Sequence, residues 1–136
     1  MSVDDVINTS SYSMLTSKYW MCQEKEPAGP SPRTGHDVFF GMIDDPDERT
    51  LIFASEQEPE GFPGDGYGPL TAFRIRTSRP FAAPGFLAAL CAAIAATESS
   101  VLVMSTFTFD YIFVRQERSE LAREALEGRG LRVESP

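Results

Sequence analysis

The sequence is poor in the residues that build metal centres, disulfide frameworks and catalytic triads. Of its 136 residues, one is histidine and two are cysteine. Two cysteines cannot build a disulfide framework, so Cys22 and Cys91 are predicted to be buried free thiols. Neither a CxxC nor an HxxxH pair occurs, so no metal site and no cofactor are expected. A histidine-dependent triad would have to use His36, a loop residue expected at the surface, so no catalytic residue is predicted.

Long hydrophobic runs and an excess of positive charge are also missing. The longest apolar run, Pro84–Ala96, has 13 residues, whereas a helix needs about 20 to span a bilayer. The first residues are polar and acidic, which is unlike a signal peptide. We therefore expect a soluble, cytoplasmic protein without a membrane partner. A net charge of -8 repels phosphate backbones, so nucleic acid is not an expected partner.

Charge is divided unevenly along the chain. Residues 1–66 hold 13 acidic and 4 basic side chains, whereas residues 67–136 hold 7 acidic and 8 basic ones. Residues 1–66 are therefore the acidic part of the chain, and most of the basic residues follow them. The length of the chain and its hydrophobic content of 42% fit one globular domain or two small units that share a core.

Turn-forming residues separate two parts of different pattern. Residues 1–11 are polar and are expected to be unstructured. The first part is predicted to contain strands at 12–22, 38–43 and 50–55, a loop at 24–37 and a hairpin turn at 44–49. Residues 56–69 are rich in proline and glycine and are the expected boundary. The predicted units are thus residues 12–66 and 67–136.

The second part has a clear order of elements. It is predicted to contain strands at 70–77, 101–106, 111–116 and 131–134 and helices at 84–97 and 119–127. Ser119 is expected to cap the second helix and Gly128 to end it. A βαββαβ order predicts an α+β, ferredoxin-like unit with an antiparallel sheet and its helices on one face. The first part has strands without helix signals, so a degenerate copy of the same unit is expected there.

Two segments of the second part carry a family resemblance. Residues 83–87, Ala-Pro-Gly-Phe-Leu, follow a strand and resemble the first turn of an ACT domain, where a Pro-Gly step opens the first helix. Residues 105–114, STFTFDYIFV, are similar to the Ser-Thr-aromatic-x-x-Asp-aromatic-x-x-Val signature of one ACT subgroup. That subgroup includes the cytosolic arginine sensors of animals and many short bacterial proteins. The resemblance covers residues 12–134 and is strongest over residues 70–134.

The resemblance implies both an architecture and a function. The short bacterial members pair an N-terminal ferredoxin-like unit with a C-terminal ACT unit, so tandem ferredoxin-like/ACT units are expected. The family implies regulatory sensing of a small molecule, usually an amino acid, at an interface between ACT units, and no catalysis. A homodimer and a regulated protein partner are also expected. Two rivals remain: a ligand-free protein interaction module that uses the open sheet face, and a small tailoring enzyme on the same scaffold.

Eight residues of these two segments are candidates for ligand binding: Ala83, Pro84, Gly85, Ser105, Thr106, Phe107, Phe109 and Asp110. Gly85 lets the backbone approach a ligand, and free N–H groups at a helix start attract a carboxylate; the alternative is a plain tight turn. Asp110 could accept from an ammonium or guanidinium group, or bond to its own backbone in a turn. In the related arginine sensors an aspartate of this motif contacts the ligand, which implies that role for Asp110.

The remaining candidates have structural alternatives too. Ser105 and Thr106 offer hydroxyls at a strand end where a bulge could free backbone groups for a ligand. Phe107 and Phe109 could wall a pocket or stack on a cation, or they could be ordinary core or interface residues. The arginines of residues 74–79 form a basic stretch, which is either a solvated face paired with acidic residues or a site for an anion.

Overall fold

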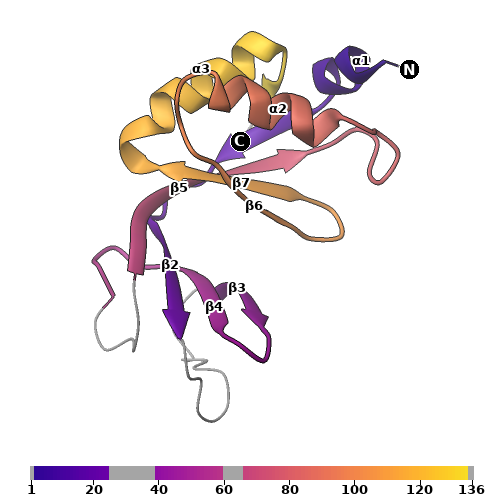
Figure 1. Cartoon of the computed structure of the whole chain (residues 1–136). Helices are drawn as coiled ribbons and strands as arrows, with labels where there is room; N and C mark the ends of the chain where they lie inside the picture. The colour runs from indigo at the N-terminus through magenta and orange to yellow at the C-terminus, as the bar shows by residue number, and fades with distance from the viewer. Residues whose placement is uncertain (1, 25–38, 60–65, 135–136) are drawn as a thin grey trace. The chain divides into compact units, whose positions relative to one another are not determined.

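The structure is a computed structural model that describes residues 2–24, 39–59 and 66–134 (Figure 1). It divides into two compact units: unit 1 comprises Met1–Thr16 and Thr71–Pro136, and unit 2 comprises Ser17–Leu70. His36, residues 25–37 of the predicted loop and residues 60–65 of the predicted boundary lie outside the described residues. The boundary between the units falls within one strand, β5 (Gly66–Arg76).

Unit 1 is an α+β unit with helices on one face of its sheet, as predicted (Figure 1). Its elements are α1 (Val3–Asn8), β1 (Ser11–Met14), the end of β5, α2 (Phe86–Ala95), β6 (Leu102–Ser105), β7 (Asp110–Arg115), the 3-10 turn η1 (Gln116–Arg118), α3 (Ser119–Arg129) and β8 (Arg132–Val133). The strands pair in the order β6-β7-β5-β1-β8. The fold class is therefore the predicted one, with an additional strand.

The core of unit 1 lies between its sheet and its helices. Apolar residues alternate along the strands, so every second side chain faces the helices. Phe73 and Ile75 of β5 and Ile112 of β7 are fully buried against Leu90 of α2 and Leu126 of α3. This contiguous cluster extends to α1 and β1, so it joins the sheet to all three helices of the unit.

The first eleven residues are not unstructured, contrary to the sequence prediction. Residues 3–8 form α1, whose Val6 and Ile7 are buried. The helix begins with a capping box, in which the Asp5 N–H donates to Ser2 Oγ and the Ser2 N–H donates to Asp5 Oδ2, both at 3.2 Å. Caps of this kind satisfy N–H groups that a helix leaves free at its start. The buried apolar face and the cap together explain why so short a segment is ordered.

Strand β1 accounts for the difference between the predicted and observed units. The predicted strand at 12–22 is two strands, β1 and β2 (Tyr19–Glu24). Strand β1 pairs antiparallel with β5, where Tyr12 lies opposite Ile75, and parallel with β8. Residues 12–16 therefore belong to unit 1 instead of the predicted unit 12–66, and residues 67–70 belong to unit 2. A four-residue strand gains its stability from this pairing, and the local sequence alone does not show it.

Helix α3 also begins and ends differently from the prediction. Ser119 does not cap it, because its hydroxyl donates to the Gln116 carbonyl at 2.8 Å and Arg118 occupies the N-cap position. Gly128 lies within the helix, and Gly130 ends it with φ 113°. The left-handed conformation is one that glycine adopts without steric cost. The helix is therefore two residues longer than predicted.

Unit 2 is a small sheet with no helix among its described residues. Strands β2, β3 (Phe39–Asp44), β4 (Arg49–Ala54) and the start of β5 pair antiparallel in the order β3-β4-β2-β5. The predicted hairpin turn is confirmed: Asp45 Oδ1 accepts from the N–H groups of Asp47 and Glu48 at 2.8 and 2.9 Å. An aspartate commonly closes turns in this way.

Candidate functional site

Two clefts of unit 1 contain the predicted site residues. The first, the α2 cleft, has a volume of about 260 Å³; it is lined by the start of α2 and its approach, including Ala83, Pro84 and Leu87, and by Asp110. The second, the hairpin cleft, has a volume of about 270 Å³ and is lined by residues 105–110 together with Pro80. Thr77, Phe81 and Asp110 line both clefts.

The turn between β6 and β7 is closed by its own polar groups. The Thr106 N–H donates to the Phe109 carbonyl at 2.8 Å, and the Phe109 N–H donates to Thr106 Oγ1 at 3.1 Å. The ladder runs without a shift from the Leu102–Phe113 pair to the Ser105–Asp110 pair. The expected bulge is therefore absent from the described ladder, and the Thr106 hydroxyl is already used within the turn.

Asp110 is the first residue of β7, whereas the sequence placed it between two strands. Its Oδ1 accepts a hydrogen bond of 2.5 Å from Ser105 Oγ, so it is not a turn aspartate bonded to its own backbone. Burial raises the pKa of the Cys91 thiol on α2, and the negative charge of Asp110 raises it further. Asp110 thus places a carboxylate in the walls of both clefts, beside a thiol that stays protonated.

The start of α2 favours negative groups, in contrast to the negatively charged Asp110. Gly85 occupies the N-cap with φ 85°, and no side chain accepts from the first turn. That turn also contains no acidic residue. The aligned peptide dipoles and the free N–H groups of a helix start favour a negative group. The α2 cleft is therefore bordered by a carboxylate and by the positive end of a helix dipole.

Phe107 is an exposed residue and does not belong to the buried core. Its side chain is 83% exposed, and that of Phe81 is 79% exposed. The two rings meet edge to face with centroids 5.1 Å apart. Phe81 has φ 60°, a strained conformation for a residue with a bulky side chain. Strain of this kind occurs preferentially at functional sites, and it presents the Phe81 ring at the mouth of both clefts.

Phe109 contacts the basic stretch that the sequence analysis identified. The guanidinium carbons of Arg74 and Arg76 lie 4.5 and 4.7 Å from the centre of the Phe109 ring. Such stacking is a favourable cation–π arrangement. Arg76 also forms an ion pair with Glu134 at 3.1 Å, so one arginine of the stretch is paired with an acidic residue as expected.

The structure brings seven of the eight predicted residues together around the two clefts. Gly85 lines neither cleft but sets the start of α2 beside them. Sequence reasoning missed Phe81 and Thr77. The available signal for Phe81 was an aromatic residue directly after a proline in the connection between a strand and a helix.

The described ranges contain neither a cluster of metal ligands nor a helix fit to cross a membrane. Residues 2–24, 39–59 and 66–134 contain no group of three or more His, Cys, Asp or Glu side chains that could hold a metal ion. Both cysteines are free, Cys22 buried and Cys91 partly buried. No helix within these ranges has the length and hydrophobicity that a membrane crossing requires.

Comparisons with known proteins agree with the fold. The family model of the ACT domain matches residues 70–128. No curated protein matches the chain. Among solved structures, a protein of unknown function from Vibrio cholerae, described as a possible transport protein, has a TM-score of 0.77 at 18% identity, covering 95% of this chain and 96% of that one. A protein of Agrobacterium tumefaciens has a TM-score of 0.70 at 19% identity, covering 92% of both chains.

A third similar structure is that of a regulatory subunit of an enzyme. The regulatory subunit of aspartate kinase from Thermus thermophilus, in a ligand-free form, has a TM-score of 0.65 at 12% identity, covering 90% of this chain and 98% of that one. Sequence identities this low are evidence for a shared fold only. Residues 70–128 thus match the ACT domain family, and the chain has the α+β, ferredoxin-like fold of ACT regulatory domains.

Proposed function

We propose that this protein is a non-catalytic regulatory sensor that binds an amino acid or a similar zwitterionic metabolite in the α2 cleft. One observation carries the proposal: the first turn of α2 and the Asp110 carboxylate line the same cleft. A ligand carboxylate would be held by the helix start, and a ligand ammonium group by Asp110. An amino acid has both groups on one carbon atom, which suits a cleft of about 260 Å³.

The hairpin cleft would then take the side chain of the ligand. It adjoins the α2 cleft through Thr77, Phe81 and Asp110. Its aromatic wall suits an apolar chain with a cationic end that can stack on a ring. This composition supports placing the protein with the arginine-sensor subgroup of ACT proteins, to which the 105–114 signature is similar.

We further propose that two ACT-like units act together in a cytoplasmic protein. Unit 2, residues Ser17–Leu70, would be a degenerate ferredoxin-like partner of the ACT unit. A second copy of the chain would complete the site, because Phe81, which lines both clefts, and Phe107, which lines the hairpin cleft, are exposed. Large exposed aromatic side chains that gather in one place commonly mark interaction surfaces. Binding at such an interface would shift the balance between two assemblies or partners.

The test is a thermal-shift screen of the purified protein with the twenty amino acids and common polyamines. A ligand at 100 times its dissociation constant stabilises a protein by about 2.7 kcal/mol, which corresponds to several degrees. Asp110→Asn should abolish the shift and leave the melting temperature of the free protein nearly unchanged, because Asp110 is partly exposed. Asp47→Asn removes the same charge from an exposed turn of unit 2 and should leave the shift intact.

Two results would count against the proposal. Equal binding by Asp110→Asn and the unaltered protein would remove Asp110 from the site. An absence of any shift across the panel would favour the rival function, a ligand-free interaction module that uses the sheet face on which Arg74 and Arg76 stack against Phe109.

A further inference from the structure

Unit 1 has a third cleft, at the edge of its sheet formed by β1 and β8, which no sequence pattern predicted. This β1 cleft has a volume of about 510 Å³, larger than the α2 cleft or the hairpin cleft. It lies where the pairing of β1 with β8 ends: Ser11 and Tyr12 are paired with β8, whereas Ser13 and Met14 extend beyond. Its walls come from β1, β5, α3 and the end of β8. None of its lining residues lines the other two clefts.

Three polar atoms in the walls of the β1 cleft lack a hydrogen-bond partner. They are Ser13 Oγ, Arg74 Nε and Glu134 Oε2, each shielded from solvent. Ser13 lies directly opposite Arg74 in the β1–β5 register, so two of the three side chains are neighbours. Buried polar atoms without a partner are rare in folded proteins, and each one calls for an explanation. Three such atoms in the walls of one cleft point to a partner that enters from outside.

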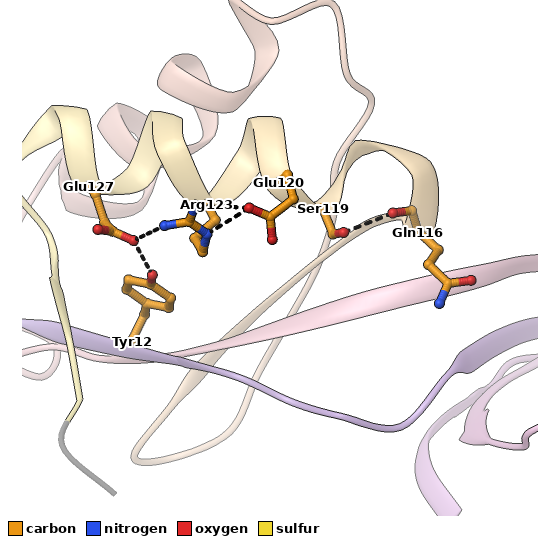
Figure 2. A network of polar contacts seen from close by, with 6 residues as sticks. All are labelled: Tyr12, Gln116, Ser119, Glu120, Arg123 and Glu127. Atoms are coloured by element: carbon orange, nitrogen blue, oxygen red, sulfur yellow. Dashed lines mark hydrogen bonds and ion pairs between the residues drawn. The ribbon is translucent and has the colours of Figure 1, made fainter.

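The two arginines that line this cleft, Arg74 and Arg123, differ in their ion pairing. Arg123 is held by Glu120 and Glu127, with a 2.8 Å contact to each. Figure 2 shows Arg123 and the Tyr12 hydroxyl directed at the same Glu127 carboxylate. Arg74 forms no ion pair with any described residue, and its guanidinium group stacks on Phe109 instead. Arg74 is therefore the cation of the cleft that can accept a new anion.

We propose that the β1 cleft is a second binding site, for a small molecule that carries a carboxylate and, a few bonds away, an N–H or O–H donor. Because the unpartnered atoms are shielded from solvent in the free protein, binding includes a movement of the side chains that line the cleft. The carboxylate then pairs with the Arg74 guanidinium group and accepts from Ser13 Oγ. The donor group bonds to Glu134 Oε2, whose neighbour Oε1 is already taken by Arg76. Met14 and Val133, which are 40% and 63% exposed, cover the apolar part of the ligand.

Binding in the β1 cleft would be coupled to the hairpin cleft through Arg74. The Arg74 guanidinium group contacts Phe109, and Phe109 lines the hairpin cleft. A carboxylate in the β1 cleft draws the guanidinium group away from the ring. The proposal itself depends only on the β1 cleft, and it holds whether or not the α2 cleft binds an amino acid.

A ¹H–¹⁵N NMR titration with 3-hydroxybutyrate tests the proposal, because this probe has a carboxylate and a donor group. We expect shifts of the Arg74 Nε–H signal and of the Ser13, Met14 and Glu134 amides. Two matched compounds remove one feature each: 3-hydroxybutyramide lacks the carboxylate and 3-methoxybutyrate lacks the donor. Each should bind about tenfold more weakly or worse, since a charge-assisted or buried hydrogen bond is lost.

Three variants locate the site and separate it from the proposed function. Arg74→Lys keeps the charge but lacks Nε and should weaken binding about tenfold. Ser13→Ala should weaken binding while the melting temperature of the free protein stays the same or rises, because an unsatisfied buried hydroxyl is removed. Asp110→Asn should leave the titration unchanged. Shifts confined to residues 77–110, equal binding by Arg74→Lys, or no shift of any of these signals would each overturn the proposal.

Discussion

The two units of this chain are stabilised in different ways. Unit 1 buries a contiguous cluster of thirteen apolar residues between its sheet and its helices. Among the described residues of unit 2, one buried cluster joins Trp20, Cys22, Leu51 and Phe53, and Tyr19, Ile52 and Leu70 are buried as well. Unit 2 also buries an ion pair, Glu24 with Arg49 at 3.5 Å, whereas the ion pairs of α3 are exposed. Among the described residues, the units therefore differ in charge burial: unit 2 buries an ion pair within its sheet, whereas unit 1 keeps the ion pairs of α3 at its surface.

The largest expected effect comes from removing that buried charge. Arg49 is 6% exposed and also contacts Asp44 at 3.2 Å. Arg49→Ala leaves Glu24 buried without its partner and should lower the free energy of unfolding by about 3–5 kcal/mol. The chain has one tryptophan, Trp20 in the core of unit 2, so urea unfolding followed by its fluorescence reports on this unit.

The matched control is Arg123→Ala in unit 1. Arg123 is about one-third exposed and its two carboxylate partners are more exposed, so its loss should cost no more than about 1 kcal/mol. Equal losses for Arg49→Ala and Arg123→Ala would contradict the contrast between the units.

Two glycines give the next comparison. A Cβ at Gly68 of unit 2 would lie 2.8 Å from Trp20 Cε3 and 2.9 Å from the Tyr19 carbonyl oxygen. Gly68→Ala should therefore cost about 1–3 kcal/mol through overpacking. A Cβ at Gly85 of unit 1 meets nothing within 4 Å, and only its φ of 85° opposes a side chain, so Gly85→Ala should cost about 1–2 kcal/mol. A Gly68→Ala protein as stable as the unaltered one would show that the Trp20 contact can relax.

The smallest effect concerns the polar network of unit 1 in Figure 2. The Tyr12 hydroxyl donates to Glu127 Oε2 at 2.5 Å, and Tyr12→Phe should cost about 1 kcal/mol. Burial, and then the Glu127 carboxylate, raise the pKa of Tyr12 to about 12 from an ordinary value of 10.0. The folded state thus holds this proton more tightly than the unfolded state.

That difference in pKa gives the network a defined pH dependence. Its contribution is complete below about pH 10 and is lost as the pH rises through about 12. Stability should fall across this window in the unaltered protein, and the part of the fall due to Tyr12 should be missing in Tyr12→Phe. Identical pH profiles for the two proteins would remove Tyr12 as the source.

Most of unit 1 could be predicted from the sequence because its elements are long and periodic. The alternation along residues 70–77 and the apolar run that begins at Pro84 each identified their element. Segments with a local chemical signature were also predictable, such as the aspartate turn after β3. The residues around Asp110 lie close together because one hairpin and one helix start supply nearly all of them, and their role in binding stays a prediction.

The rest depended on contacts between distant segments. Strand β1 is four residues long and is ordered by pairing with β5 and β8. Gly130 ends α3 instead of Gly128, and a Cβ at Gly130 would collide with Asn8 of α1, a contact that no local pattern shows. The β1 cleft was missed for the same reason, because Ser13, Arg74 and Glu134 lie far apart in the sequence.

The most direct test of the central claim is a map of ligand contacts on the whole chain. Once the thermal-shift screen has identified an amino acid, its ¹H–¹⁵N NMR titration should perturb the amides of residues 83–87 and 105–110 of unit 1 first and most strongly. Asp110→Asn should remove these shifts. Shifts centred on unit 2, or an unchanged pattern in Asp110→Asn, would contradict the assignment of ligand sensing to the α2 cleft.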